Sequence, residues 1–326
     1  MLKKIPKLLL LIIVSFFILI GVVITISSLF EAKSLSNPQK VRFVIPKGQA
    51  VTIIAQRLEA EKLIKSAWAF RLAIYKNHLT NKIQAGSFEL SANMSTWEIA
   101  QALTVGTNDL WITLPEGWRR EEIAESLTKQ GLPFFSADEF LELSKGLEGQ
   151  LFPDTYLVPR EINAEQLLSL LQNTFNNKVT HALSAVLAKS QLSLNEVLTL
   201  ASLVQRESAL DSEMPLVAQI LFNRLAIQMP LQVDATLQYI KGFNQVSGTW
   251  WSTPLADDKK LDSLYNTYKY AGLPPGPICN PGLAAIQAVL NPTSTSALFY
   301  LHDQNGKIHT ANNLQEHNNN VNKYLR

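Results

Sequence analysis

The stretch of the chain with the clearest chemical potential is LASLVQRESAL, residues 200–210, in which one acid stands among regularly spaced apolar residues. The apolar positions recur every three or four residues, which predicts a helix with one face toward the core. At about 100° of rotation per residue, Glu207 lies about 20° from Leu200 and about 60° from Val204 on that helix. The spacing therefore predicts that the Glu207 carboxyl group points inward.

A carboxyl group in apolar surroundings holds its proton more tightly than one in water, because burial penalises the charged form. An acid that is neutral near pH 7 can protonate a poor leaving group, such as the departing sugar oxygen in glycosidic bond cleavage. The spacing leaves a second interpretation equally open. In it, Glu207 closes the last helical turn, reaches an arginine such as Arg224 and has only a structural role.

The elements that would position this acid are predicted to be mainly helical. Ser193 and Glu196 have the spacing of a capping box, so we expect the helix that carries Glu207 to begin near Ser193. Helical patterns continue to about Ile227, after which the chain is rich in loops. Residues 272–282, GLPPGPICNPG, hold four prolines and are not expected to form a regular element. The C-terminal residues are predicted to form two short strands around an Asn-Gly turn and a final helix.

The first part of the chain is predicted to be a membrane anchor. Residues 8–30 contain no charged side chain, and a helix of roughly 35 Å would cross about 30 Å of hydrocarbon. Three lysines precede this run, which predicts a cytoplasmic tail at residues 1–7 and an external location for the remainder. A cleaved signal peptide is the alternative, although its apolar region is usually shorter and ends in small residues. Residues 31–40 are predicted to be a linker.

Two segments of the chain resemble each other. Residues 41–64 and 110–132 each begin with β-branched and aromatic residues, continue through a Pro-x-Gly turn and end with apolar residues at helical spacing. Their shared identities at one offset predict a duplicated strand-turn-helix unit, with chance similarity between helices as the alternative. Between the copies we expect a helix at SAWAFRLAIYKNH, a strand at AGSFELS and a helix capped by Ser95 and Glu98, which together make a small α+β unit.

Composition narrows the class of protein. The 326 residues suffice for one membrane segment and about two domains, and their formal net charge is +2. Because three lysines precede the apolar run, the remainder is nearly neutral, which argues against a nucleic-acid partner. The lone Cys279 cannot form an internal disulfide. The five histidines lack metal-binding spacing, and the chain has no phosphate-cradling glycine loop, so we predict neither a metal nor a cofactor.

Several motifs occur in the order found in one known family: LEGQLFPDTY, ASLVQRES, FNRL, MPLQVDAT, YNTY, GLPPGPICNPG and EHN. With them, nearly the whole chain is similar to the YceG-like family of endolytic murein transglycosylases. The resemblance implies an α+β protein with a LysM-like module at residues 41–106. It also implies a mainly helical catalytic domain with short strands and Pro/Gly-rich loops at residues 107–326, which begins with the second strand-turn-helix copy.

The resemblance also implies a reaction. Glu207 would act as general acid and then as base in cutting the β-1,4 bond between N-acetylmuramic acid and N-acetylglucosamine of peptidoglycan. Because the muramic acid 6-hydroxyl attacks its own anomeric carbon, a 1,6-anhydro end forms, and a second carboxylate nucleophile is not required. The expected partners are glycan strands, the bacterial inner (plasma) membrane and a peptidoglycan synthase, beside which the enzyme would terminate glycan elongation.

Polar residues in the same motifs are candidates for holding the sugar, together with Glu148 as a supporting acid. Each has a structural alternative, because polar residues in loops most often serve the loop. Trp250 and Trp251 are predicted to form either an aromatic platform or, more often for such a pair, a buried contact. The predicted substrate-binding residues are Asp154, Gln232, Asp234, Asn266, Tyr268 and Asn280.

The chain departs from the family pattern at two places. Leu264 stands where relatives tend to have proline. Lys307 and Ile308 stand where many relatives have a Gly-His pair, with His309 one place later, which puts a role for a C-terminal histidine in doubt.

Two other functions are kept as alternatives. One is a membrane-anchored scaffold that binds peptidoglycan without cutting it. The other is a pyridoxal-dependent lyase, which an external domain behind a membrane helix argues against.

Overall fold

The computed structural model of the chain describes residues 7–34, 39–46, 48–105 and 109–326, with side chains from residue 14 onward. It divides into two compact units, one of residues 1–111 with 157–160 and one of residues 112–156 with 161–326. The predicted boundary at residues 106 and 107 falls outside the described residues and stays a prediction. The LysM-like and catalytic assignments of the two parts stay predictions.

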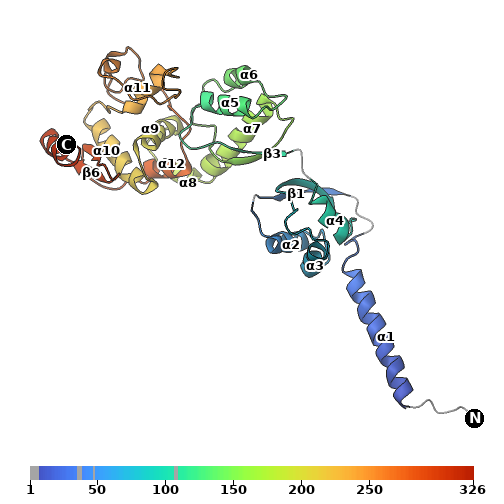
Figure 1. Ribbon diagram of the computed structural model, residues 1–326. Coiled ribbons are helices and arrows are strands. Elements are labelled where there is room, and N and C mark those ends of the chain that lie inside the picture. The colour runs from blue at the N-terminus through green and yellow to red at the C-terminus, as the bar shows by residue number, and fades with distance from the viewer. Residues whose placement is uncertain (1–6, 35–38, 47, 106–108) are drawn as a thin grey trace, which may run out of the picture. The chain divides into compact units, whose positions relative to one another are not determined.

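The first unit contains a long N-terminal helix and a small α+β unit (Figure 1). Its two strands are antiparallel, with Phe43 opposite Phe88, and the helices bury Leu58 and Phe70 against them. The predicted capping box is confirmed, because Ser95 and Glu98 bond each other's backbone amides. The elements are α1 (Lys7–Ser28), β1 (Lys40–Ile45), α2 (Val51–Ala60), α3 (Ala67–Lys76), β2 (Gly86–Ser91) and α4 (Thr96–Ala102).

The predicted transmembrane segment at residues 8–30 largely coincides with helix α1. Among the described residues, no helix combines the length and apolar character that crossing a membrane requires. Residues 1–6 of the predicted cytoplasmic tail lie outside the described residues, as do the side chains of residues 7–13. Membrane anchoring therefore stays a prediction.

Both similar segments consist of a strand, a turn and a helix. The second comprises β3 (Asp109–Thr113) and α5 (Arg120–Lys129), whose first residues follow those of β1 and α2 by the same offset. In each turn a glycine has a positive φ, +79° at Gly48 and +78° at Gly117, a conformation that other residues rarely adopt. The same backbone requirement therefore explains the glycine shared by the two turns.

The second unit is mainly helical with short strands (Figure 1). The coarse prediction of a mixed helical protein is therefore confirmed. Strands β3 and β4, which pair with each other, have residues in both units, and β5 pairs with β6 within the second unit. Beyond β3 and α5, the elements are α6 (Ala137–Leu143), β4 (Thr155–Pro159), α7 (Ala164–Phe175), the π-helical turn η1 (Asn176–His181), α8 (Ser184–Leu187), α9 (Leu194–Glu207), the 3₁₀ turn η2 (Asp211–Glu213), α10 (Met214–Ala226), α11 (Asp234–Lys241), the 3₁₀ turn η3 (Ala256–Lys260), α12 (Leu283–Leu290), β5 (Phe299–His302), β6 (Ile308–Ala311) and α13 (Leu314–Tyr324).

Helix α9 lies at the centre of this unit's core. Every side chain from Val197 to Val204 is buried, and the helix packs against α10, α11 and α12. The irregular segment 272–282 joins the same core, because Ile278 is buried and its backbone amide donates to the Ser202 hydroxyl at 3.0 Å. The prediction that these residues form no regular element is confirmed, and the helix that carries Glu207 is held on several sides.

The C-terminal strands and helix follow the prediction. Strands β5 and β6 are antiparallel, with Leu301 opposite His309, and α13 packs against both. Because side chains alternate along a strand, Tyr300 and His302 share one face of β5. That face bears on the site described next.

Candidate active site

Helix α9 ends at Glu207, and local chemistry fixes both of its ends. At its start, the Ser193 hydroxyl accepts from the Glu196 amide while the Glu196 carboxylate accepts from the Ser193 amide at 2.7 Å, so the predicted capping box is confirmed. At its end, Ser208 has an extended backbone and closes the last turn by donating to the Val204 carbonyl. The helix therefore holds Glu207 at a fixed point on the edge of the core.

The Glu207 carboxyl group is half-buried and accepts a hydrogen bond from the Tyr300 hydroxyl, with 2.5 Å between the oxygens. Burial raises the pKa of Glu207 above its ordinary value, and the nearby Asp234 carboxylate acts in the same direction. The Tyr300 hydrogen bond, Arg224 and His302 act in the opposite direction. The carboxyl group thus has an environment that favours its protonated form and a neighbour that orients it.

The Tyr300 hydroxyl is itself held in its protonated form. Burial raises its pKa well above 10, and the charge of Glu207 adds to that effect. Tyr300 therefore remains a donor to Glu207 at any pH near neutrality. His302, on the same face of β5, lies 3.0 Å from the Glu213 carboxylate through its Nε2 atom.

Arg224 is the arginine that the structural interpretation pairs with Glu207. Its guanidinium group is buried and donates to the backbone carbonyls of Leu298, at 2.6 Å, and Leu231. It acts on Glu207 as a nearby positive charge. Its hydrogen bonds tie α10 to the segments before β5 and α11, so it holds together the elements that carry Tyr300 and Asp234.

Asp234 and Tyr268, two of the predicted substrate-binding residues, lie together near Glu207. The Tyr268 hydroxyl donates to the Asp234 carboxylate at 2.6 Å. The charge of Asp234 raises the pKa of Glu207, and the charge of Glu207 raises the pKa of Tyr268. Asp234 is exposed and Tyr268 is half-buried. Gln232, a third candidate, is exposed just before α11, and its backbone amide donates to the Thr267 carbonyl at 3.0 Å. Asp234 and Tyr268 are thus neighbours of Glu207, and the role of all three residues in binding sugar stays a prediction.

Asn266 and Asn280 have structural partners instead. Asn266 is fully buried, and its side-chain amide donates to the carbonyls of Lys259 and Leu261 while its oxygen accepts from the Tyr268 amide. It therefore shapes the loop that presents Tyr268. The geometry gives no support for a sugar contact at Asn266, because the polar atoms of its side chain are used within the loop.

Asn280 joins three distant parts of the second unit. Its side-chain oxygen accepts from the amides of Gly149 and Leu151 at 2.8 and 2.9 Å. Its side-chain nitrogen donates to the Trp118 carbonyl and, at 2.8 Å, to the Glu148 carboxyl group. Since these hydrogen bonds use both polar atoms of the side chain and Asn280 is 1% exposed, the side chain serves as a clamp, and the geometry gives no support for a sugar contact.

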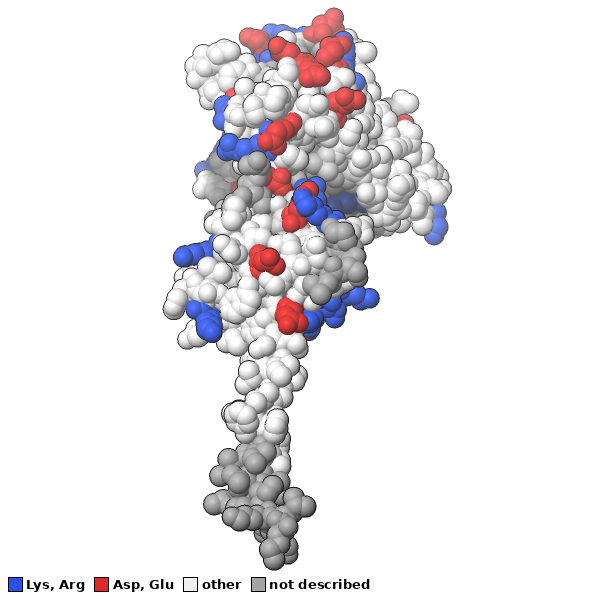
Figure 2. Space-filling view, turned by 90° about the vertical axis from the view of Figure 1, so that its right-hand side faces the viewer, with Lys and Arg blue, Asp and Glu red and all other residues white. Residues whose placement is uncertain are grey.

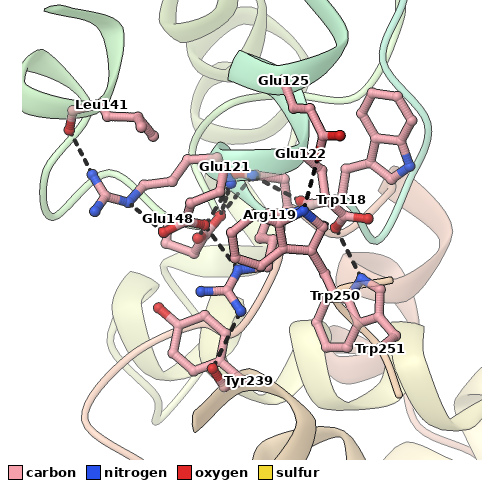
Figure 3. A network of polar contacts seen from close by, with 12 residues as sticks. Trp118, Arg119, Glu121, Glu122, Glu125, Leu141, Glu148, Tyr239, Trp250 and Trp251 are labelled. Atoms are coloured by element: carbon pink, nitrogen blue, oxygen red, sulfur yellow. Dashed lines mark hydrogen bonds and ion pairs between the residues drawn. The ribbon is translucent and has the colours of Figure 1, made fainter. Parts of the chain in front are cut away.

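Glu148, the predicted supporting acid, belongs to that clamp through its hydrogen bond from Asn280. Figure 3 shows Glu148 in a network of polar contacts that includes Arg119 and Glu121. Burial raises its pKa to about 8, with the charge of Glu121 as the next cause. Its oxygens accept from the Arg120 amide at 3.2 and 3.4 Å in addition to Asn280. Glu148 is thus a buried structural acid.

Asp154 is bound elsewhere in the unit. Its carboxylate pairs with Lys178 at 2.6 Å and accepts from the Thr155 amide at 2.8 Å. Neither partner belongs to the group around Glu207, so the geometry gives no support for a sugar contact at Asp154.

Trp250 and Trp251 are half-buried, which is intermediate between the exposed aromatic platform and the buried contact that the sequence allows. Their indole N–H groups donate to Glu125, at 3.1 Å, and to Glu122, at 2.9 Å (Figure 3). Arg206 lies 3.9 Å from the centre of the Trp251 ring. The pair is fixed against α5 by these contacts.

Tyr300 is the site residue that the sequence interpretation missed. It lies 93 residues beyond Glu207 in the chain and in none of the family motifs quoted above. The usable signal is the strand pattern FYLH, in which alternation puts two titratable side chains, Tyr300 and His302, on one face.

The two departures from the family pattern lie in the loop before Asn266 and at strand β6. Leu264 is 67% exposed. His309 bonds the Asp303 carboxylate at 2.9 Å and stacks on Tyr324 with 3.6 Å between ring centres. The displaced histidine is thus engaged within the C-terminal strands and helix.

On the face shown in Figure 2, Lys and Arg side chains are mixed with Asp and Glu among a majority of uncharged residues.

Fold and site together define a mixed helical protein with short strands that carries a half-buried acid between a tyrosine hydroxyl and an exposed aspartate. Comparison with known proteins identifies the family. The chain belongs to the YceG-like family, whose model matches residues 43–323, so the predicted family is confirmed.

Curated relatives carry one name. A protein of Bacillus subtilis named endolytic murein transglycosylase is 31% identical over 91% of this chain and 88% of its own length. Proteins of the same name from two Streptococcus pneumoniae strains are 31% identical over 86% of this chain, which spans 58% of their length. The crystal structure of a YceG-like protein from Listeria monocytogenes has a TM-score of 0.54 and 29% identity, covering 86% of this chain and 99% of that one.

Proposed function

We propose that this protein is an endolytic lytic transglycosylase, which cuts the β-1,4 bond between N-acetylmuramic acid and N-acetylglucosamine within peptidoglycan strands. The family and the name shared by its curated relatives support the enzyme class. The observation that carries the chemistry is the Glu207 carboxyl group at the end of α9, half-buried with a raised pKa and oriented by Tyr300. Such an acid is suited to protonating a sugar leaving group.

In the first half of the reaction, Glu207 donates its proton to the glycosidic oxygen as the bond from that oxygen to the muramic acid anomeric carbon breaks. Because Oε2 accepts from Tyr300, the proton is carried by the other carboxyl oxygen. In the second half, the muramic acid 6-hydroxyl bonds to the anomeric carbon and passes its proton to the Glu207 carboxylate. The acid is regenerated, no water is consumed, and the product has a 1,6-anhydro end.

The neighbouring residues divide the remaining work. Arg224 and His302 stabilise the carboxylate that exists between the two proton transfers, while burial and Asp234 favour the protonated acid. Asp234, Tyr268 and Gln232 can accept from or donate to sugar hydroxyl and acetamido groups. A carboxyl group placed between opposing influences can lose and regain a proton within one catalytic cycle.

The proposal extends to the cellular setting. Residues 8–30, free of charge and preceded by lysines, would anchor the chain in the inner membrane with the N-terminus in the cytoplasm. The α+β unit at residues 41–106 would be the LysM-like module beside the membrane. An enzyme held there would cut newly made strands next to a synthase and so terminate their elongation.

Product analysis tests the reaction. Purified peptidoglycan incubated with the full chain should release fragments with 1,6-anhydromuramic acid ends, identified by mass spectrometry. Reducing ends, heavier by one water, would indicate a hydrolase. If the chain binds peptidoglycan and releases neither product over a range of pH, the scaffold alternative is correct.

A further inference from the structure

A second feature of the unit that carries Glu207 could bind sugar. A pocket of 250 Å³ lies between α5 and the residues near 243–250, with the aromatic rings of Trp118, Phe243 and Trp250 among its walls. The carboxylates of Glu122 and Glu125 also line it. Ligand pockets for drug-sized molecules measure about 300–1,000 Å³, so this one is sized for a single ring and not for a long segment of polymer.

The walls of this pocket are built in advance of any ligand. Trp250 donates its indole N–H to Glu125 at 3.1 Å (Figure 3). It also packs against Phe243 with 5.3 Å between ring centres. On its other side, the Arg119 guanidinium lies 4.7 Å from the Trp250 ring centre. Binding therefore needs little ordering of these side chains, which favours affinity.

The charges that line the pocket are balanced. Glu125 pairs with Lys129 at 2.7 Å, and Glu122 interacts electrostatically with Arg119 and Arg206. A cationic ligand would have to compete with these protein cations. A neutral ligand with hydroxyl and amide N–H donors can instead use the remaining acceptor positions of the two carboxylates.

The pocket is connected to the end of α9. Glu122 lines the pocket and also accepts the indole N–H of Trp251 at 2.9 Å. Arg206 lies over that same indole, and the next residue along the chain is Glu207. This chain of contacts ties the wall of the pocket to the end of α9, in the unit that carries Glu207.

From these observations we infer that the pocket is a subsite for one N-acetylhexosamine ring of the strand, outside the two sugars of the scissile bond. The C–H face of the ring would lie on the indoles, and its hydroxyl and acetamido N–H groups would bond to Glu122 and Glu125. The inference rests on the proposed function, and it explains how the enzyme could favour the interior of long strands over short fragments.

Filling the pocket tests the inference with little change to its walls. Ser126 lines the pocket on α5, and Ser126→Phe should occupy the space for the ring. Thr128→Phe places the same ring on an exposed position of α5 as the control. The measured quantity is kcat/KM on long peptidoglycan strands divided by kcat/KM on a tetrasaccharide of the same repeat. Ser126→Phe should lower that ratio roughly tenfold, and a ratio equal to that of the parent and control overturns the subsite.

A binding measurement separates the subsite from the reaction. Full-length Glu207→Gln protein is titrated with the tetramer of N-acetylglucosamine, and tryptophan fluorescence follows the pocket indoles. Saturable binding that Ser126→Phe weakens supports the subsite even if the parent chain releases no anhydro ends, in which case only the proposed reaction fails. Binding of equal strength in Glu207→Gln with and without Ser126→Phe overturns the subsite even if the parent enzyme is active.

Discussion

Glu207 and Glu148 are two acids of the same unit whose protonated forms are both favoured by burial, yet their surroundings differ. The oxygens of Glu148 accept from a backbone amide and from the Asn280 side chain, inside a clamp that joins distant segments. Glu207 accepts from a tyrosine hydroxyl and lies near Asp234, an exposed carboxylate at the start of α11. One acid is enclosed by structural groups, whereas the other stands at the end of a helix beside groups that can meet a ligand.

This comparison shows that a raised pKa by itself does not identify a catalytic acid. Strongly shifted groups occur at functional sites and also in structural networks. Burial raises the pKa of Glu148 to about 8, but the residue is only 9% exposed and its carboxyl oxygens accept hydrogen bonds from groups of the fold. For Glu207, a tyrosine that orients the carboxyl group and the nearby Asp234 supply what the pKa does not.

The largest effect should come from Glu207→Gln, which keeps the shape of the side chain and removes its ionisable proton. We expect the release of anhydro ends to fall at least ~100-fold, because general acid–base catalysis typically contributes that much or more. The rate is measured on peptidoglycan strands, with Glu165→Gln at an exposed position of α7 as the control. Release by the purified variant at the parent rate would refute the catalytic assignment.

Tyr300→Phe should sharpen the assignment by moving a pH profile. The Tyr300 hydroxyl stabilises the charged form of Glu207, so its removal should raise the pKa of Glu207 further. Since the protonated acid starts the reaction, the high-pH limb of kcat should move up by about one unit. The rate at the optimum should fall about tenfold as the carboxyl group loses its orientation.

The control for this experiment is Tyr270→Phe, which removes another tyrosine hydroxyl that donates to a carboxylate, that of Asp262. It should leave the high-pH limb where it is in the parent. A Tyr300→Phe enzyme with an unmoved limb would show that the hydrogen bond to Glu207 has no part in setting its proton affinity.

Asn280→Ala tests the clamp on the other side of the comparison. It removes the acceptor of two buried backbone amides, so the free energy of unfolding should fall by about 3 kcal/mol. Activity per folded molecule should fall less than tenfold. Denaturant unfolding and kinetics are compared with Asn319→Ala at an exposed position of α13. A large rise in KM with unchanged stability would restore the predicted sugar contact.

The elements of the fold were largely predictable because their signals are local. Ser95 with Glu98 and Ser193 with Glu196 mark helix starts through bonds between residues three apart, and the pattern of prolines excludes regular structure in residues 272–282. The Asn-Gly turn likewise marks the C-terminal hairpin. Each of these features depends on neighbours in the chain and not on the packing of distant segments.

The site was predictable only in part, for the opposite reason. Periodicity placed Glu207 inward and motif resemblance drew attention to Asp234 and Tyr268, which the fold brings near it. Tyr300 comes from a strand far along the chain, and no local pattern connects it with Glu207. For Asn280 the sequence left two roles open, because an amide in a loop can serve a ligand or the backbone equally well, and only the fold shows the hydrogen bonds that it makes to Gly149 and Trp118.

The smallest effect on activity should come from Glu148→Gln, which keeps the clamp neutral at every pH. In the parent, the folded-state pKa of Glu148 is raised to about 8 from an ordinary value of 4.5. Its contribution to stability is therefore complete below about pH 4.5 and is lost as pH rises toward 8. The variant lacks this loss, so its stability relative to the parent should increase between pH 5 and pH 8. Denaturant unfolding at both values measures the change, and Glu142→Gln on the exposed side of α6 should show none. Identical pH dependence in parent and Glu148→Gln would mean that the clamp holds a carboxylate at both values, and the contrast between the two acids would then rest on their neighbours alone.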